Sequence, residues 1–170
     1  MIPYLQGKLI GLLTELLVKL STPMYPFPRE TFFATISQGF GIANKHYRSG
    51  IHNGVDFAVV VGTPVVSPFR GEIYQVFKNH KSMGNACYYR FVHQKTQYWM
   101  RFLHLRDVPK LGVYNPGDVI CYSGNTGDST GPHLHMELWK VAINPALIGT
   151  KAGVLKNLLD PVAWFRSKVG

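Results

Sequence analysis

The chain has 170 residues, 46% of them hydrophobic, so it is long enough to bury a core and too apolar to be disordered. Eighteen lysines and arginines against nine aspartates and glutamates give a net charge of +9. This charge suits an anionic wall polymer or a membrane surface, although solubility alone would also account for it. The basic residues are scattered and form no nucleic-acid-binding motif, so no nucleic-acid partner is expected.

Residues 1–21 are predicted to form an amphipathic helix that packs on its own domain or on a partner copy, with a membrane-surface role as the weaker alternative. Glu15 and Lys19 interrupt the apolar run, which excludes a membrane span. No positive charge precedes Lys8 and no cleavage site follows, which argues against a signal peptide. The apolar stripe has helical spacing and consists of Leu5, Leu9, Leu12, Leu13, Leu16, Leu17 and Leu20.

Residues 22–30 hold three prolines and are predicted to connect this helix to a single domain at 31–170. Short β-branched and aromatic runs bounded by Gly and Pro then predict strands, with a hairpin turn at "HQKTQ" and a short helix before Asp160. No βαβ rhythm is present, so the fold class is mostly β, an antiparallel sandwich or barrel-like core. The strand-like runs are "TFFATISQGFG", "VDFAVVVG", "TPVVSPFRG", "EIYQVF", "ACYYRFVH", "QYWMRFLHL", "GDVICYSG" and "HLHMELWK".

Cys87 and Cys121 each lie in a strand-like run. Two cysteines are too few for a disulfide scaffold and lack the clustering of a thiolate zinc site. Two buried thiols are the favoured interpretation, and a single bridge between them is left open.

The stretch "GPHLHMEL" alternates polar and apolar residues. In a strand, His133, His135 and Glu137 would share one face, opposite the apolar residues between them. A plain surface strand would show this alternation too, but imidazoles are an unusual choice for a solvated face. The sharper hypothesis is a strand that presents metal ligands or acid–base groups to a cleft.

A second pair occurs in "GIHNGVDFAV", where His52 lies in a predicted turn and Asp56 near the start of the next strand. Two histidines and one carboxylate suit Zn²⁺ and leave a fourth position for water, as in catalytic zinc sites. His104 in "QYWMRFLHL" is predicted to share a strand face with Phe102 and Met100, so taken alone it would be a core histidine. The loop "GNTGDSTGPH" lacks the Lys-Ser/Thr of a phosphate-binding loop and is expected to form a cleft wall.

In their order along the chain, "HNGVD", "GTPVVS", "FLHL", "GDVICYSGNTGDSTGPHLHMEL" and "NP" resemble the lysostaphin-type (LytM-like) zinc metalloendopeptidases, which cut peptide bonds in bacterial peptidoglycan. The resemblance covers roughly residues 25–146. It implies that His52, Asp56 and His135 bind zinc. It also implies that His133 and His104 are catalytic groups beside the metal.

Two further residues match the family less directly. Glu137 corresponds to a common family residue that is not a ligand, and we expect it to support a ligand from behind. Some members carry a tyrosine before the first ligand that helps hold the reacting oxygen. Tyr47 is the candidate for this role here, with its register left open.

The resemblance predicts a zinc-dependent endopeptidase acting on a stem peptide or cross-bridge of peptidoglycan, in the manner of a phage endolysin or a virion-associated lysin. Such a protein would be made in the cytoplasm and act on the cell wall after release. The alternatives are a non-catalytic domain of the same fold that binds peptidoglycan or activates an amidase, and a β-rich phosphocarrier. Asp56 disfavours the phosphocarrier, because a carboxylate would repel a phosphohistidine.

Overall fold

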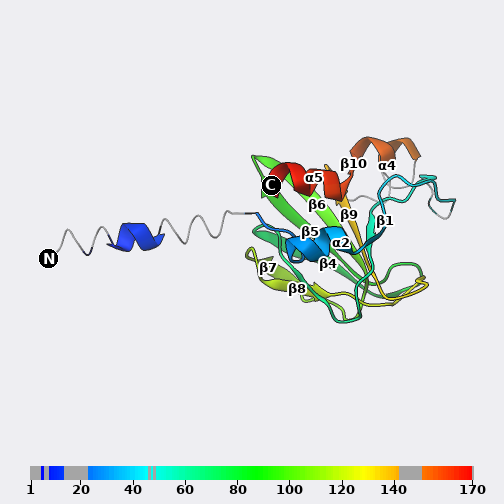
Figure 1. Ribbon diagram of the computed structural model, residues 1–170, viewed down its shortest axis with the longest axis horizontal. Coiled ribbons are helices and arrows are strands. Elements are labelled where there is room, and N and C mark those ends of the chain that lie inside the picture. The colour runs from blue at the N-terminus through cyan, green and yellow to red at the C-terminus, as the bar shows by residue number, and fades with distance from the viewer. Residues whose placement is uncertain are drawn as a thin grey trace.

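The computed structural model describes residues 5, 8–13, 23–45, 47, 49–141 and 151–169. Its main feature is an eight-stranded sheet in the order β1-β2-β9-β6-β5-β4-β7, with β10 also paired to β9, and every pairing is antiparallel (Figure 1). A two-stranded sheet, β3-β8, completes the described strands. The mostly β, antiparallel prediction is confirmed. The strands are β1 Ile36–Gln38, β2 Val55–Phe57, β3 Pro64–Val66, β4 Gly71–His80, β5 Gly84–His93, β6 Thr96–Leu105, β7 Gly112–Tyr114, β8 Val119–Tyr122, β9 Leu134–Trp139 and β10 Leu158–Leu159.

The predicted hairpin joins the two ten-residue strands β5 and β6. Gln94 and Lys95 form its turn with φ values of 48° and 64°. Positive φ at both central residues is the mirror-image turn whose twist matches that of the strands it connects. The long hairpin places β6 next to β9, in the middle of the sheet.

Helix α2, Arg29–Ala34, corrects the strand predicted at "TFFATISQGFG", because only residues 36–38 of that stretch are extended. Phe32 explains the difference: its ring lies 4.9 Å from that of Tyr25, 5.0 Å from Phe57 and 5.5 Å from Phe165. Burial of this aromatic residue in the core outweighs the local preference of Phe and Thr for strands.

The C-terminal helices are α4, Lys151–Asn157, which was predicted, and α5, Pro161–Val169, which was not. Asp160 caps α5, because its Oδ1 accepts hydrogen bonds from the backbone N–H groups of Val162 (2.8 Å) and Ala163 (3.2 Å). Pro161 at the first helical position fits the same start signal.

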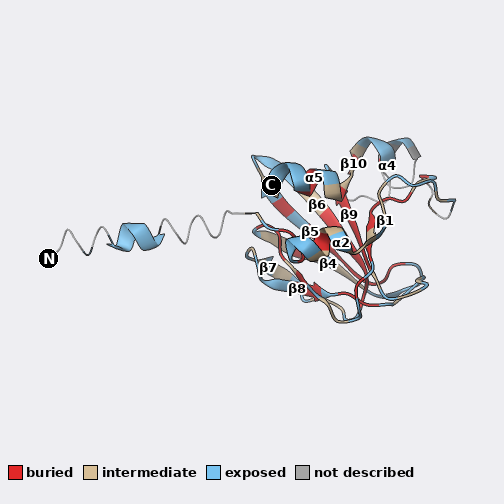
Figure 2. Cartoon of the chain, viewed as in Figure 1, coloured by how far each residue is buried: buried red, intermediate tan, exposed pale blue. Residues whose placement is uncertain are grey.

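The main core lies between one face of the sheet and helices α2 and α5, as the buried stretches of the central strands show (Figure 2). Strand β9 is buried along its whole length, on both faces. Its apolar side joins the core as predicted, so its polar side must be covered by something else. Its core residues are Leu134, Met136 and Leu138.

Cys87 and Cys121 are both buried and free, as favoured from the sequence. Burial and the neighbouring Cys87 thiol raise the pKa of Cys121 well above its ordinary value. Of the predicted N-terminal helix, residues 8–13 are helical, with Leu9 and Leu12 exposed, and most of the rest lies outside the described residues. Within the described part of the chain, no helix is long and apolar enough to cross a membrane.

Gly54, just before β2, allows β2 to approach β9 closely. A Cβ at this position would overlap the Met136 carbonyl oxygen and come within 2.9 Å of His135 Nε2. We therefore expect Gly54→Ala to lower the free energy of unfolding by about 1–3 kcal/mol, the usual cost of overpacking. Urea denaturation measures this. Gly131→Ala is the matched control, because no atom of the described residues, apart from its chain neighbours, lies within 4 Å of its Cβ position. An equal effect of both variants would contradict the prediction.

Candidate metal centre

Strands β2 and β9 bring the first two candidate ligands together. Asp56 lies directly opposite His135 in the β2–β9 pairing, so their side chains share one face of the sheet. His52 lies in the loop before β2, and this loop is held by a hydrogen bond from the His52 N–H to the carbonyl oxygen of Ile42, at 2.7 Å. The turn folds His52 back beside Asp56, as the sequence predicted.

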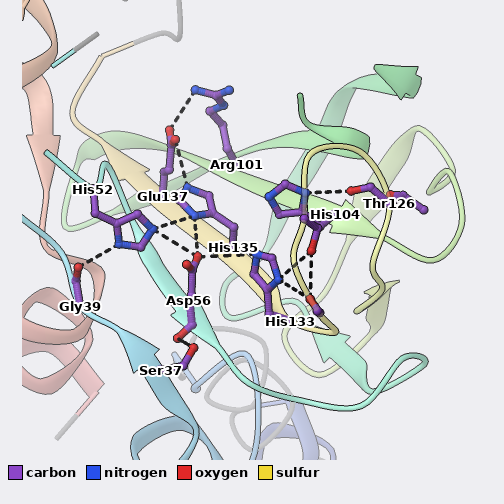
Figure 3. A network of polar contacts seen from close by, with 12 residues as sticks. Ser37, Gly39, His52, Asp56, Arg101, His104, Thr126, His133, His135 and Glu137 are labelled. Carbon is purple, nitrogen blue, oxygen red and sulfur yellow. Dashed lines mark hydrogen bonds and ion pairs between the residues drawn. The ribbon is translucent and has the colours of Figure 1, made fainter. Parts of the chain in front are cut away.

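The three side chains direct one donor atom each at a common point (Figure 3). Asp56 Oδ1 lies 2.7 Å from His135 Nδ1 and 3.2 Å from His52 Nε2, and the two ring nitrogens are 3.1 Å apart. Among the residues that the structure describes, these three form the group of His, Cys, Asp and Glu side chains whose ligand atoms all lie within 4.8 Å of one another.

In each imidazole ring, one nitrogen donates a hydrogen bond to the protein, and this leaves the other nitrogen available to a metal. His52 Nδ1 donates to the Gly39 carbonyl oxygen at 2.8 Å, which leaves a lone pair on Nε2. His135 Nε2 donates to Glu137 Oε1 at 3.2 Å, which leaves a lone pair on Nδ1. Two imidazole lone pairs and a carboxylate oxygen at one point are a donor set that fits Zn²⁺.

The electrostatics of the cluster also favour a cation. Burial would raise the pKa of Asp56, but the imidazole rings of His135 and His52, which lie within hydrogen-bond distance, hold it below its usual range. Burial would lower the pKa of His135, but Asp56 and Glu137 raise it. The two carboxylates that attract a proton to His135 attract a metal cation for the same reason, and metal binding would displace that proton.

Glu137 is the centre of a buried polar network beside His135, on the same face of β9. Its side chain is 1% exposed, and its Oε2 accepts hydrogen bonds from Arg101 Nη1 at 3.0 Å and Trp139 Nε1 at 2.8 Å. Burial would raise the pKa of Glu137, but the Arg101 guanidinium and the His135 hydrogen bond lower it to about 2. This network covers the polar face of β9 and keeps Glu137 ionised.

Arg101 is the member of this network that sequence reasoning missed. It lies on β6 directly opposite Glu137, and its side chain is 10% exposed. A lone arginine between Met100 and Phe102, in an apolar strand, was the available signal. A buried charge needs a partner, which the neighbouring strand supplies.

His104 does not share a strand face with Phe102 and Met100, which corrects the sequence prediction. Its φ of 61° is left-handed and interrupts the alternation of β6. Met100 and Phe102 are in the core, whereas Arg101, Leu103 and His104 line a cleft on the other side of the sheet. His104 Nδ1 donates to the Thr126 carbonyl oxygen at 2.8 Å, and burial lowers the pKa of His104 to about 4.

His133 precedes β9 and lies close to the metal cluster without joining it. Its ring centroid is 4.6 Å from that of His104, and its Nε2 is 3.9 Å from Asp56 Oδ1. Its Nδ1 donates to the Gly131 carbonyl oxygen at 2.8 Å, with Ser129 Oγ at 3.1 Å. The His133 Nε2 is thus the nitrogen left for chemistry in the cleft.

The cleft has a volume of about 490 Å³ and takes in Asp56, His104 and His133. Residues 128–130 line it, so the "GNTGDSTGPH" loop forms a wall as predicted. Tyr47 lines it too, with its ring centroid 5.5 Å from that of His52 and 6.2 Å from that of His135. Burial raises the pKa of Tyr47, so its hydroxyl stays protonated at neutral pH.

Comparison with known proteins places this geometry in a family. Residues 50–145 match peptidase family M23. The peptidoglycan DD-endopeptidase ShyB of Vibrio cholerae is 36% identical over 117 residues, which are 66% of this chain and 26% of ShyB. Lysostaphin of Staphylococcus simulans is 34% identical over 101 residues, 58% of this chain and 20% of lysostaphin. The chain therefore spans about a quarter or less of these curated relatives.

Solved structures show the same fold. The LytU structure superimposes with a TM-score of 0.60 and 30% identity, over 78% of this chain and 85% of LytU. The catalytic domain of lysostaphin from Staphylococcus simulans gives a TM-score of 0.59 and 25% identity, over 76% of this chain and 90% of that domain. A zinc-containing peptidase from Vibrio cholerae gives a TM-score of 0.56 and 34% identity, over 71% of this chain and 37% of that peptidase.

These matches confirm the lysostaphin-type resemblance seen in the sequence. The family match covers more than half of the chain and contains every residue of the His52, Asp56 and His135 cluster. The chain belongs to peptidase family M23.

Proposed function

We propose that the protein is a zinc-dependent endopeptidase that hydrolyses peptide bonds in bacterial peptidoglycan. The observation that carries the proposal is the convergence of His52 Nε2, Asp56 Oδ1 and His135 Nδ1 at one side of an open cleft. The names of the relatives, a peptidoglycan DD-endopeptidase and lysostaphin, support the substrate class.

The three clustered residues hold the metal in this proposal. When bound there, zinc supplies a Lewis acid that activates water and polarises a carbonyl group near neutral pH. The donor set uses two neutral imidazoles and one carboxylate, which leaves room for the reacting groups. Glu137 fixes the tautomer of His135 through its Nε2–H.

His133 and His104 handle protons. Each donates its Nδ1–H to a backbone carbonyl, so Nε2 is the nitrogen that can take a proton from water and return it to the leaving amine. The low pKa of His104 keeps its ring neutral above about pH 5, so its Nε2 can accept a hydrogen bond at neutral pH. Tyr47, which keeps its hydroxyl proton and lines the cleft, is the proposed hydrogen-bond donor to the scissile carbonyl oxygen.

The proposed site of action is the cell wall, as a lysin released from the cytoplasm or carried in a virion. The net charge of +9 would hold the protein near anionic wall polymers or the membrane surface. A non-catalytic domain of the same fold remains the alternative function. The complete donor set, with two further imidazoles beside it, favours the enzyme.

Digestion of purified peptidoglycan tests the activity. We expect the protein to release new amino termini from at least one cross-link chemotype, detected by mass spectrometry. Prior treatment with a chelator should abolish the release and added zinc should restore it, because the cleft residues act on water only with the metal in place. Binding to peptidoglycan without any new amino termini would support the non-catalytic alternative.

Separate replacement of His135, on β9, and of His133, just before it, distinguishes zinc binding from proton transfer. His135→Ala should lose zinc and turnover together, because it removes a ligand. His133→Ala should keep about one zinc per chain and lose turnover by a factor on the order of 10² or more, because it removes a proton carrier. Paired measurements of zinc content and turnover decide this. Loss of zinc from His133→Ala with retention in His135→Ala would reverse the assignment.

Glu137→Gln tests the support behind His135. The substitution keeps the side-chain shape but removes the charge that orients the His135 Nε2–H and balances Arg101. We expect zinc affinity to fall by about 10- to 100-fold, measured by competition with a chelating dye. Glu72→Gln, which breaks the exposed ion pair with Arg90, is the control and should leave zinc affinity unchanged. Equal zinc affinity in both variants would contradict the prediction.

A further inference from the structure

Arg101 has hydrogen-bond donors without an oxygen acceptor among the residues that the structure describes. A guanidinium carries five N–H donors in a planar fork. Nη1 donates to Glu137 Oε2 at 3.0 Å, and Nη2 contacts the Met83 thioether sulfur at 3.0 Å. Nε is buried and has no hydrogen-bond partner among the residues that the structure describes. Buried donors are normally satisfied, so an edge of the fork that lacks an oxygen partner points to a missing acceptor.

Arg101, which carries this edge without an oxygen partner, lines the cleft, and so does Met83. Met83 ends the turn between β4 and β5, and its side chain is unbranched and flexible. A thioether is a weak acceptor that an incoming oxygen can displace. Tyr88 covers one face of the guanidinium, with its ring centre 5.2 Å from Arg101 Cζ, so a ligand cannot approach from that face.

The charge of Arg101 is only partly neutralised by Glu137. That carboxylate is shared among three donors, from His135, Arg101 and Trp139. A second carboxylate bound edge-on to Arg101 would find the bidentate geometry that guanidinium groups prefer. The Arg101 donors that lack an oxygen partner are therefore suited to binding a carboxylate.

The position of Arg101 relative to the metal cluster indicates which carboxylate of the substrate it would bind. Arg101 pairs with Glu137, and Leu103 pairs with His135, so the arginine lies two strand positions from the ligand, about 7 Å by the rise per residue. A substrate bound in extended form with its scissile bond at the metal cluster would bring a substituent of the adjoining residue to this distance.

We propose that Arg101 is a specificity residue that binds a free carboxylate on the substrate residue adjoining the scissile bond, and that Met83 is the side chain displaced by it. The inference rests on the proposed endopeptidase function. In a cross-link to the D-centre of diaminopimelate, the carbon that bears the scissile amide nitrogen also bears a free carboxylate. A glycine cross-bridge has no such group, so the proposal selects the diaminopimelate chemotype.

Two soluble cross-linked peptides that differ only in this group, carboxylate or carboxamide, test the proposal with the zinc-loaded full chain. We expect the wild type to prefer the carboxylate peptide in kcat/KM by about 10- to 100-fold, the range for a charge-assisted hydrogen-bond pair. Arg101→Gln should abolish the preference. Arg101→Lys, which keeps the charge without the fork, should retain only part of it.

Control variants separate recognition from support of Glu137. If Arg101 only positions Glu137, Arg101→Gln and Arg101→Lys will slow both peptides alike and leave the ratio unchanged, which would overturn the proposal. Arg90→Gln removes the same charge from an exposed ion pair and should keep the wild-type ratio.

Measurements on the wild type alone distinguish a failure of the role of Arg101 from a failure of the proposed endopeptidase function. Equal cleavage of the carboxylate and carboxamide peptides would overturn the role of Arg101 and leave the endopeptidase function standing. Cleavage of neither peptide, nor of intact peptidoglycan, would overturn the proposed function itself and this inference with it.

Discussion

The site depends on the close pairing of β2 with β9. This pairing sets Asp56 directly opposite His135, and the missing side chain of Gly54 lets the two strands approach without a clash at the Met136 carbonyl oxygen. Both donors are therefore positioned by backbone hydrogen bonds in the interior of a sheet, where strands move little. Only His52 comes from a loop, and its ring is held by the Gly39 carbonyl on its other side. A metal centre built this way is largely preorganised before any ion binds.

Charge is arranged in layers away from this pairing. His135 lies between two carboxylates, Asp56 on β2 and Glu137 two positions further along β9, and Arg101 lies beyond Glu137. A buried carboxylate without partners would be costly, but Glu137 has three donors, so it stays ionised and holds one tautomer of the imidazole. The same arrangement explains why β9 is buried on both faces: apolar residues fill one side, and a satisfied polar network fills the other.

The sequence predicted the features that depend on local pattern and missed those that depend on register. Alternation along "HLHMEL" correctly placed Leu134 and Met136 in the core, and the two-histidine and carboxylate pattern correctly brought His52 to Asp56. The Arg101–Glu137 pair could not be predicted, because it depends on the alignment of β6 with β9 and its two residues lie 36 positions apart in the sequence. Helix α2 was misread because long-range contacts of Phe32 decide its conformation, whereas the Asp160-Pro161 start of α5 was a readable signal.

The left-handed conformation of His104 connects the core to the chemistry. A β-strand that continued its alternation would send His104 into the core beside Phe102, where an imidazole has no partner. One residue at a φ of 61° costs of order 1 kcal/mol, and it moves this side chain to the face that already carries Arg101 and Leu103. The Thr126 carbonyl then accepts the Nδ1–H and holds the ring 4.6 Å from that of His133. Local strain in β6 thus brings a second proton carrier to the cleft without disturbing the pairing that holds the metal ligands.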